Sequence, residues 1–213
     1  MTQQPARLTG KPILGLVGGV GCGKSTVAEL LRQLGGGVVA GDPVGHDALK
    51  QPDIKQCVLD RWGSDLLNAQ GQIDRVKLGA IVFANSQERR QLEQLVFPWI
   101  RERLRERMAQ VDADAAVQFI VLDAAVMLEA GWDSVCDRIL FIDVPEATRK
   151  ARVAQQRGWS AEEVRNREAA QWSLERKRKL ADAVVHNDGT LEQTKAQLVA
   201  IIQGFQQTGW RKD

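Results

Sequence analysis

The sequence predicts an α/β protein in which helices flank a five-stranded parallel sheet. Five short segments are nearly continuously apolar, as expected for strands that are buried on both faces of a parallel sheet. Helical patterns separate these segments along the chain, which is the alternation that parallel strands require. The chain of 213 residues, 44% of them hydrophobic, is long enough for one compact unit with an insertion.

The predicted strands and the first helix follow from these patterns. The first strand is expected at 12–18, and a helix runs from Lys24 to about Leu34, where three consecutive glycines end it. Further apolar segments predict the remaining strands at 38–42, 117–124, 138–144 and 182–188.

A long helical stretch separates the second and third predicted strands. Apolar side chains recur every four residues from Leu92 to Met108, so we expect an amphipathic helix that is kinked or begins near Pro98. This stretch is interpreted as a helical insertion into the core of the fold. The predicted division is a core of residues 12–60 and 115–205 and a helical insertion of residues 61–114.

Charge and cysteine content limit the possible functions. The formal net charge is +2, so no overall field favours nucleic acid or an anionic membrane. The three cysteines are widely spaced without a CxxC pair, which indicates neither a disulfide framework nor a zinc site. No apolar run approaches the ~20 residues of a membrane span, and no signal-peptide core is present. We therefore expect a cytoplasmic protein without a nucleic-acid or membrane partner, and nothing in the sequence indicates its oligomeric state.

A glycine-rich segment carries the strongest functional pattern. GGVGCGKS matches GxxxxGK[ST], directly after the first predicted strand and directly before the first helix. Glycines let backbone N–H groups approach phosphate oxygens, and the lysine adds a full positive charge toward the β and γ phosphates. The serine hydroxyl would reach Mg²⁺. The segment predicts a P-loop NTPase fold that binds ATP with Mg²⁺ through Gly19, Val20, Gly21, Cys22, Gly23, Lys24, Ser25 and Thr26.

Two aspartates stand at the carboxyl ends of predicted strands, the edge at which open α/β sheets bind ligands. Asp42 follows the second strand and is a candidate to orient or deprotonate an attacking hydroxyl. The alternative is a turn or helix-capping aspartate before Pro43. Asp123 ends the third strand, where a Walker B carboxylate would hold the metal; it too is open to interpretation as a capping residue.

A basic helical segment at 146–180 separates the last two strands, with a capping box at Ser160 and Glu163. Such charge is usually solvated helix surface, and a basic helix can also contact nucleic acid. In a kinase, the same segment would be a helical lid whose arginines neutralise charge on the transferred phosphoryl group. The candidates by position are Arg152, Arg157 and Arg167.

Taken together, these motifs resemble the dephospho-coenzyme A kinase family. The resemblance runs from about Ile13 to Ile202 and keeps the order of the family's motifs. VVAGDPVGHDAL resembles its DAD strand end, and GQIDRVKLGAIVF is similar to its G.IDR..L...VF block. VLDAAVMLEAG is similar to DVPLLFE, and the lid and ADAVVHNDG also match.

The resemblance implies a P-loop small-molecule kinase that transfers a phosphoryl group from ATP to the ribose 3′-hydroxyl of dephospho-coenzyme A, giving coenzyme A and ADP. It implies that Asp42 is the catalytic base, that Lys24 and Arg152 stabilise the transferred group, and that the insertion binds the coenzyme. The implied substrate contacts are Asp42, Arg75 and Asp123, the implied metal ligands are Ser25 and Asp123, and the implied further ATP contacts are Arg152, Arg167 and Asn187.

The chain departs from the family pattern at several positions. Ala40 replaces the first aspartate of DAD, so Asp42 carries the role of base alone. Phe97-Pro98 stands where the family often has His-Pro, Ala125 replaces the proline of PLL, and Gln156 stands near a frequent lid arginine.

Two other functions remain open at this point. One is another P-loop kinase, of a nucleoside monophosphate or a metabolite such as shikimate, against which the long insertion and the GQIDR block count. The other is a nucleotide-dependent binding or switch protein, although the chain lacks the N-K-x-D sequence with which GTPases normally read guanine.

Overall fold

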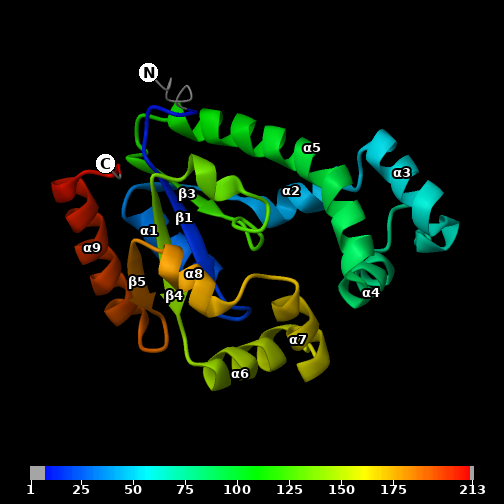
Figure 1. Cartoon of the computed structure of the whole chain (residues 1–213). Coiled ribbons are helices and arrows are strands. Elements are labelled where there is room, and N and C mark those ends of the chain that lie inside the picture. The colour runs from blue at the N-terminus through cyan, green and yellow to red at the C-terminus, as the bar shows by residue number, and fades with distance from the viewer. Residues whose placement is uncertain (1–7, 212–213) are drawn as a thin grey trace.

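The computed structural model describes residues 8–211, and these residues contain the predicted five-stranded parallel sheet (Figure 1). The strand order is β2-β3-β1-β4-β5, and each neighbouring pair is parallel. The strands are β1 (Ile13–Gly18), β2 (Gly36–Ala40), β3 (Phe119–Asp123), β4 (Arg138–Asp143) and β5 (Ala183–His186). The predicted fold class is therefore confirmed.

Helices occupy most of the remaining described chain. The core and insertion helices are α1 (Lys24–Gln33), α2 (Gly41–Ala48), α3 (Pro52–Trp62), α4 (Arg75–Ala84), α5 (Ser86–Asp112) and α9 (Leu191–Thr208). The predicted lid segment contains α6 (Glu146–Arg157), α7 (Ala161–Ala169) and α8 (Leu174–Leu180). Two short 3₁₀ turns are η1 (Ser64–Leu66) and η2 (Trp132–Val135). Figure 1 shows α3 and α4 projecting to one side of the sheet, with α6 and α7 below them.

The sheet is buried on both faces, which explains its nearly continuous apolar strands. In β1, Leu14 and Leu16 pack with α1 and α9, whereas Ile13 and Val17 pack on the opposite face toward α2 and α5. Strands β3 and β4 alternate in the same way. Because successive side chains in a strand point to opposite faces, both faces need apolar residues here.

The second strand lies two residues earlier in the chain than predicted. It begins at Gly36 and ends at Ala40, so Asp42 lies in the first turn of α2 rather than in the strand. Gly35, with φ of 89°, makes the turn after α1, whereas Gly36 and Gly37 are strand residues. A β-carbon on Gly36 would lie 2.9 Å from the Leu31 carbonyl oxygen, so this glycine is required by close packing, not by helix termination.

Helix α5 runs through Pro98 instead of beginning there. The Asn85 side chain caps its start by accepting from the backbone N–H groups of Gln87 and Glu88. Figure 1 shows a pronounced bend partway along the helix, consistent with the predicted proline kink. Of the predicted apolar series, Val96, Ile100, Leu104 and Met108 are buried, whereas Leu92 is half-buried.

The predicted lid segment is helical, but it consists of three helices with turns between them. The capping box of Ser160 and Glu163 is present at the start of α7, as predicted. Helix α3 runs across residue 60, which is the predicted boundary between the core and the insertion. Within residues 8–211, the helices are too short or too polar to cross a membrane.

Candidate active site

The glycine-rich loop connects β1 to α1 at the carboxyl end of the sheet. Gly21 and Gly23 have φ angles of 78° and 82°, a left-handed conformation that favours glycine. Lys24 and Ser25 form the first turn of α1, and the loop N–H groups with the helix start supply partial positive charge. The local geometry is that of an anion-binding loop.

Two backbone carbonyl groups of this loop accept hydrogen bonds from side chains outside the loop. The Asn187 amide donates to the Cys22 carbonyl oxygen at 2.9 Å, and Arg149 Nη1 donates to the Val20 carbonyl oxygen at 3.0 Å. In a planar trans peptide, the N–H of the next residue points the opposite way. The N–H groups of Gly21 and Gly23 are therefore directed to the other side of the loop, where phosphate oxygens would lie.

The predicted carboxylates meet Lys24 at this edge of the sheet. Asp123 ends β3, and Asp42 accepts from the backbone N–H of Ala125 at 3.4 Å. Burial raises the pKa of Asp123, whereas the positive charge of Lys24 lowers it and the negative charge of Asp42 raises it further. Lys24 and Asp42 thus both lie within electrostatic reach of Asp123.

Arg75 also belongs to this region. It is the first residue of α4, and its side chain is exposed. Burial lowers the pKa of His46 in α2, the Arg75 charge lowers it further, and Asp42 opposes both. Arg75 therefore lies near α2, the helix that carries Asp42.

The predicted lid arginines have different surroundings. Arg152 Nη1 would lie 3.8 Å from a β-carbon on Gly23, so Arg152 reaches the phosphate loop. Arg167 instead stacks on aromatic rings, 3.9 Å from the centroid of Trp159 and 4.8 Å from that of Phe83 in α4. The side chain of the third candidate, Arg157, is outside the described part of the structure.

Asn187, predicted to contact ATP, is buried behind the loop. It is 5% exposed, and besides its bond to the Cys22 carbonyl it accepts from Thr194 Oγ1 at 3.3 Å. Its amide therefore supports the phosphate loop from the protein side.

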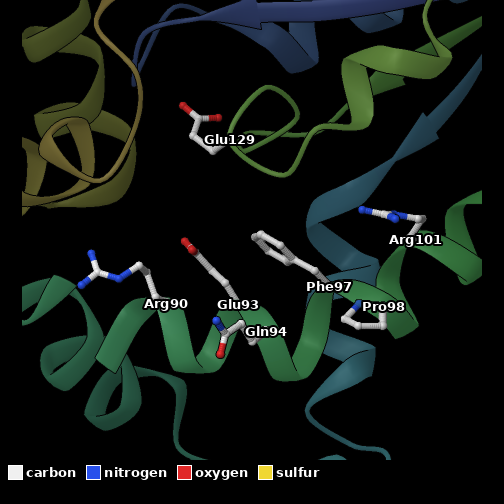
Figure 2. A pocket seen from close by; sticks show the side chains of 7 residues that line it. All are labelled: Arg90, Glu93, Gln94, Phe97, Pro98, Arg101 and Glu129. Atoms are coloured by element: carbon white, nitrogen blue, oxygen red, sulfur yellow. The ribbon is translucent and has the colours of Figure 1, made fainter. Parts of the chain in front are cut away.

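A cavity of about 410 Å³ lies between α5 and the connection that follows β3 (Figure 2). The sequence reasoning did not predict it. Phe97 and Glu93 extend from α5 toward this space, and Glu129 stands on the opposite side. Burial raises the pKa of Glu93, partly opposed by Arg89, and Glu129 adds to the rise. The lining residues are Arg90, Glu93, Gln94, Phe97, Pro98, Arg101 and Glu129.

Glu129 connects the cavity wall to the lid segment. Its Oε1 accepts from the Trp172 backbone N–H at 2.6 Å and pairs with Lys177 Nζ at 3.2 Å. Lys177 is 2% exposed and also donates to Gln171 Oε1 at 2.8 Å. Burial lowers the pKa of Lys177, while Glu129 raises it and Lys24 lowers it. The sequence signal for such a wall is the spacing of three or four residues along α5 between Arg90, Glu93, Phe97 and Arg101.

The oxygen donors at the sheet edge suit a magnesium ion that is shared with a nucleotide. Mg²⁺ is usually bound by one or two protein oxygens together with phosphates and waters. Ser25 and Asp123 supply a hydroxyl and a carboxylate at the loop. Among residues 8–211, no group of three or more His, Cys, Asp or Glu side chains could hold an ion alone.

A phosphate loop between β1 and α1, with acidic groups at the carboxyl edge of a parallel sheet, is the arrangement of P-loop kinases. A model of the dephospho-CoA kinase family matches residues 12–193. The dephospho-CoA kinase of Carboxydothermus hydrogenoformans is 36% identical over 202 residues, covering 94% of this chain and 98% of the relative. That of Geobacillus kaustophilus is 38% identical over 192 residues, covering 89% and 94%. The chain therefore belongs to the dephospho-CoA kinase family.

Solved structures agree with this assignment. A crystal structure from Thermus thermophilus superposes with a TM-score of 0.75 at 33% identity, covering 91% of this chain and 97% of the other. The dephospho-CoA kinase of Campylobacter jejuni gives a TM-score of 0.58 at 26% identity, with the same coverage. The predictions of a P-loop fold, of a kinase and of this family are confirmed.

Proposed function

We propose that Lys24, Asp42, Arg152 and their neighbours carry out the reaction of this family, transfer of the γ-phosphoryl group of ATP to the ribose 3′-hydroxyl of dephospho-CoA. The products are CoA and ADP. The observation that supports the assignment most directly is the convergence of Lys24, Asp42 and Asp123 beside the phosphate loop, at the edge of the sheet that faces the insertion.

The donor would lie on the loop with its phosphates toward the N–H groups of Gly21 and Gly23. Lys24 supplies a charge to the β and γ phosphates, and Arg152 reaches the loop from α6. Both cations stabilise charge that spreads over the phosphoryl oxygens during transfer. The helices at 146–180 would act as a lid that excludes water, with Arg167 and Asn187 completing the ATP site.

Ser25 and Asp123 would hold Mg²⁺ together with the phosphates. When bound, the ion neutralises phosphate charge and favours an in-line arrangement. The raised pKa of Asp123 is consistent with a half-buried carboxylate whose charge Lys24 compensates only in part.

The acceptor would lie between Asp42 and the insertion at 61–114. Asp42 is exposed at the start of α2 and would accept the proton of the 3′-hydroxyl, with Asp123 and Arg75 contacting the substrate nearby. Arg90 and Arg101 flank the cavity along α5, where guanidinium groups suit the diphosphate of the acceptor. Phe97, in place of the family's frequent histidine, gives this wall an apolar contact.

We also infer a cytoplasmic location, no nucleic-acid partner and no membrane partner. The small net charge and the reduced cysteines support this: Cys22, Cys57 and Cys136 are all free.

Measuring ADP production with ATP and Mg²⁺ tests the function. The acceptors are dephospho-CoA, a panel of nucleoside monophosphates, and shikimate. We expect stimulation by dephospho-CoA alone and its loss in Lys24→Ala. Turnover on another acceptor would keep the phosphate loop and refute the acceptor assignment, and slow hydrolysis without stimulation would favour a nucleotide-dependent switch.

A further inference from the structure

A buried arginine that the proposed reaction does not use lies against the phosphate loop. Arg149, in the first turns of α6, is 4% exposed. Its Nη1 donates to the Val20 carbonyl oxygen at 3.0 Å and also pairs with the carboxylate of Glu168 in α7. Burying a cation is costly unless the cation is paired and hydrogen-bonded, and here the Glu168 carboxylate and the Val20 carbonyl oxygen are the partners.

The loop is shaped to receive this arginine. A β-carbon on Gly19 would lie 2.7 Å from Nη1 of Arg149, and one on Gly21 would lie 2.6 Å from its carbonyl oxygen. Real β-carbons do not approach other atoms so closely, so these positions are glycine partly because α6 packs onto them. Val153, one turn later, lies 2.6 Å from the same position at Gly21. Helix α6 and the phosphate loop therefore form one packed unit.

We propose that Arg149 is a positioning residue for the nucleotide, and that Glu168 connects this role to lid helix α7. By holding the Val20 carbonyl, Arg149 fixes the orientation of the peptide between residues 20 and 21. The Gly21 N–H then points to the opposite side, where the phosphates of the proposed nucleotide site would lie. Arg149 acts on the loop backbone, whereas Lys24 and Arg152 are proposed to contact the phosphates directly.

This role differs in its consequences from simple packing. Without the guanidinium, the Val20 carbonyl is free to turn, and the cradle loses a fixed N–H donor for any phosphate chain. The proposed acceptor site is formed by other elements, α2, α4 and α5, and should keep its geometry. Loss of Arg149 should therefore weaken nucleotide binding selectively, whereas a packing defect would lower stability and affect both substrates alike.

The test is calorimetric titration of the full-length protein with ADP and Mg²⁺, together with the KM of each substrate. In Arg149→Met we expect ADP affinity and the KM for ATP to worsen about 10- to 100-fold, the loss typical of a hydrogen bond to a charged group. The KM for dephospho-CoA should change less than twofold. Arg149→Lys should recover part of the loss because an ammonium can still donate to Val20. The matched control is Arg165→Met, an exposed arginine of α7 that should behave as wild type.

Glu168→Gln tests the link to the lid. It leaves the Arg149 donor in place, so ADP affinity should fall less than in Arg149→Met, while amide exchange in α7 should accelerate. Unchanged exchange would contradict the link.

Several outcomes would overturn the positioning role. They are wild-type ADP affinity in Arg149→Met, a lysine variant as weak as the methionine variant, and a parallel rise in both KM values with a lowered Tm. If Arg149→Met does not fold, Arg149→Gln takes its place. The same results are expected, because the glutamine side chain is too short to reach the Val20 carbonyl oxygen. Failure of the wild-type protein to bind ADP would instead refute the proposed nucleotide site.

Discussion

Substitution of Asn187 distinguishes two roles for this residue. The sequence predicts that it contacts ATP, whereas the structure indicates that it supports the phosphate loop. In the structure its amide donates to the Cys22 carbonyl at 2.9 Å and its Oδ1 accepts from Thr194 at 3.3 Å. The variant Asn187→Ala removes both bonds and leaves a buried carbonyl of the phosphate loop without its partner.

The magnitude follows from these contacts. Two lost hydrogen bonds at about 1 kcal/mol each, plus the desolvation of an orphaned carbonyl, give a loss of about 3 kcal/mol in the free energy of unfolding. For a chain of this size, that corresponds to a fall in Tm of roughly 6–12 °C. The control Thr194→Val removes the hydroxyl that donates to Asn187 Oδ1 and to the His186 carbonyl oxygen, each at 3.3 Å, and leaves the bond between Asn187 and Cys22 in place. It should cost about 1–2 kcal/mol and leave ATP binding unchanged.

The assay combines urea unfolding with inhibition by inorganic tripolyphosphate, which has phosphates but no base. If Asn187 supports the loop, Asn187→Ala should weaken ATP and tripolyphosphate binding by the same factor. If Asn187 contacts adenine, ATP binding alone should weaken and stability should hardly change. The second result would refute the supporting role that the structure indicates.

Three further substitutions test the other parts of the site. Asp42→Asn should lower kcat about 10²- to 10⁴-fold with ATP binding retained, as expected for a lost general base; equal losses in titration and turnover would make the carboxylate structural. Asp123→Asn should impair turnover yet raise the Tm of the ligand-free protein. Burial raises the pKa of Asp123, so its cost to folding is fully present at neutral pH and disappears as pH falls toward the ordinary aspartate value; an unchanged or lowered Tm at pH 7 would contradict this. Lys177→Met should cost about 3–5 kcal/mol in chemical unfolding because the Glu129 charge is left without its cation, and adding Glu129→Leu should restore part of it, since the Trp172 N–H then loses its acceptor. Failure of the double variant to recover would contradict the pairing.

The parts of this molecule that local sequence determines were predicted well. Buried strands are apolar on both faces, and the phosphate loop needs glycine, lysine and serine at fixed spacing, so the sheet and the position of this loop follow from the sequence. The start of β2 was misplaced because Gly36 and Gly37 look like a helix stop. These two positions are glycine because α1, α5 and the neighbouring strand approach them closely. No local sequence pattern reveals that approach.

The parts that depend on packing between distant elements were not predicted. Arg149 is one of many basic residues in its segment, and only its burial against Val20 and Glu168 distinguishes it from solvated neighbours. The cavity likewise forms between α5 and the connection that follows β3, which bring together residues as far apart in the chain as Phe97 and Glu129. Its wall shows only a weak periodicity in sequence.

The surroundings of the lid arginines make Arg152 and Arg167 unequal candidates for contact with the triphosphate. Arg152 extends to the loop at Gly23, whereas the guanidinium of Arg167 lies on the rings of Trp159 and Phe83. Stacking of a cation on an aromatic face is worth about 0.5–2 kcal/mol, so moving Arg167 onto a phosphate must overcome that contact. Because Phe83 belongs to α4, the same stacking joins the predicted lid to the predicted insertion. A movement that brings Arg167 to the nucleotide would therefore also release the lid from the acceptor side.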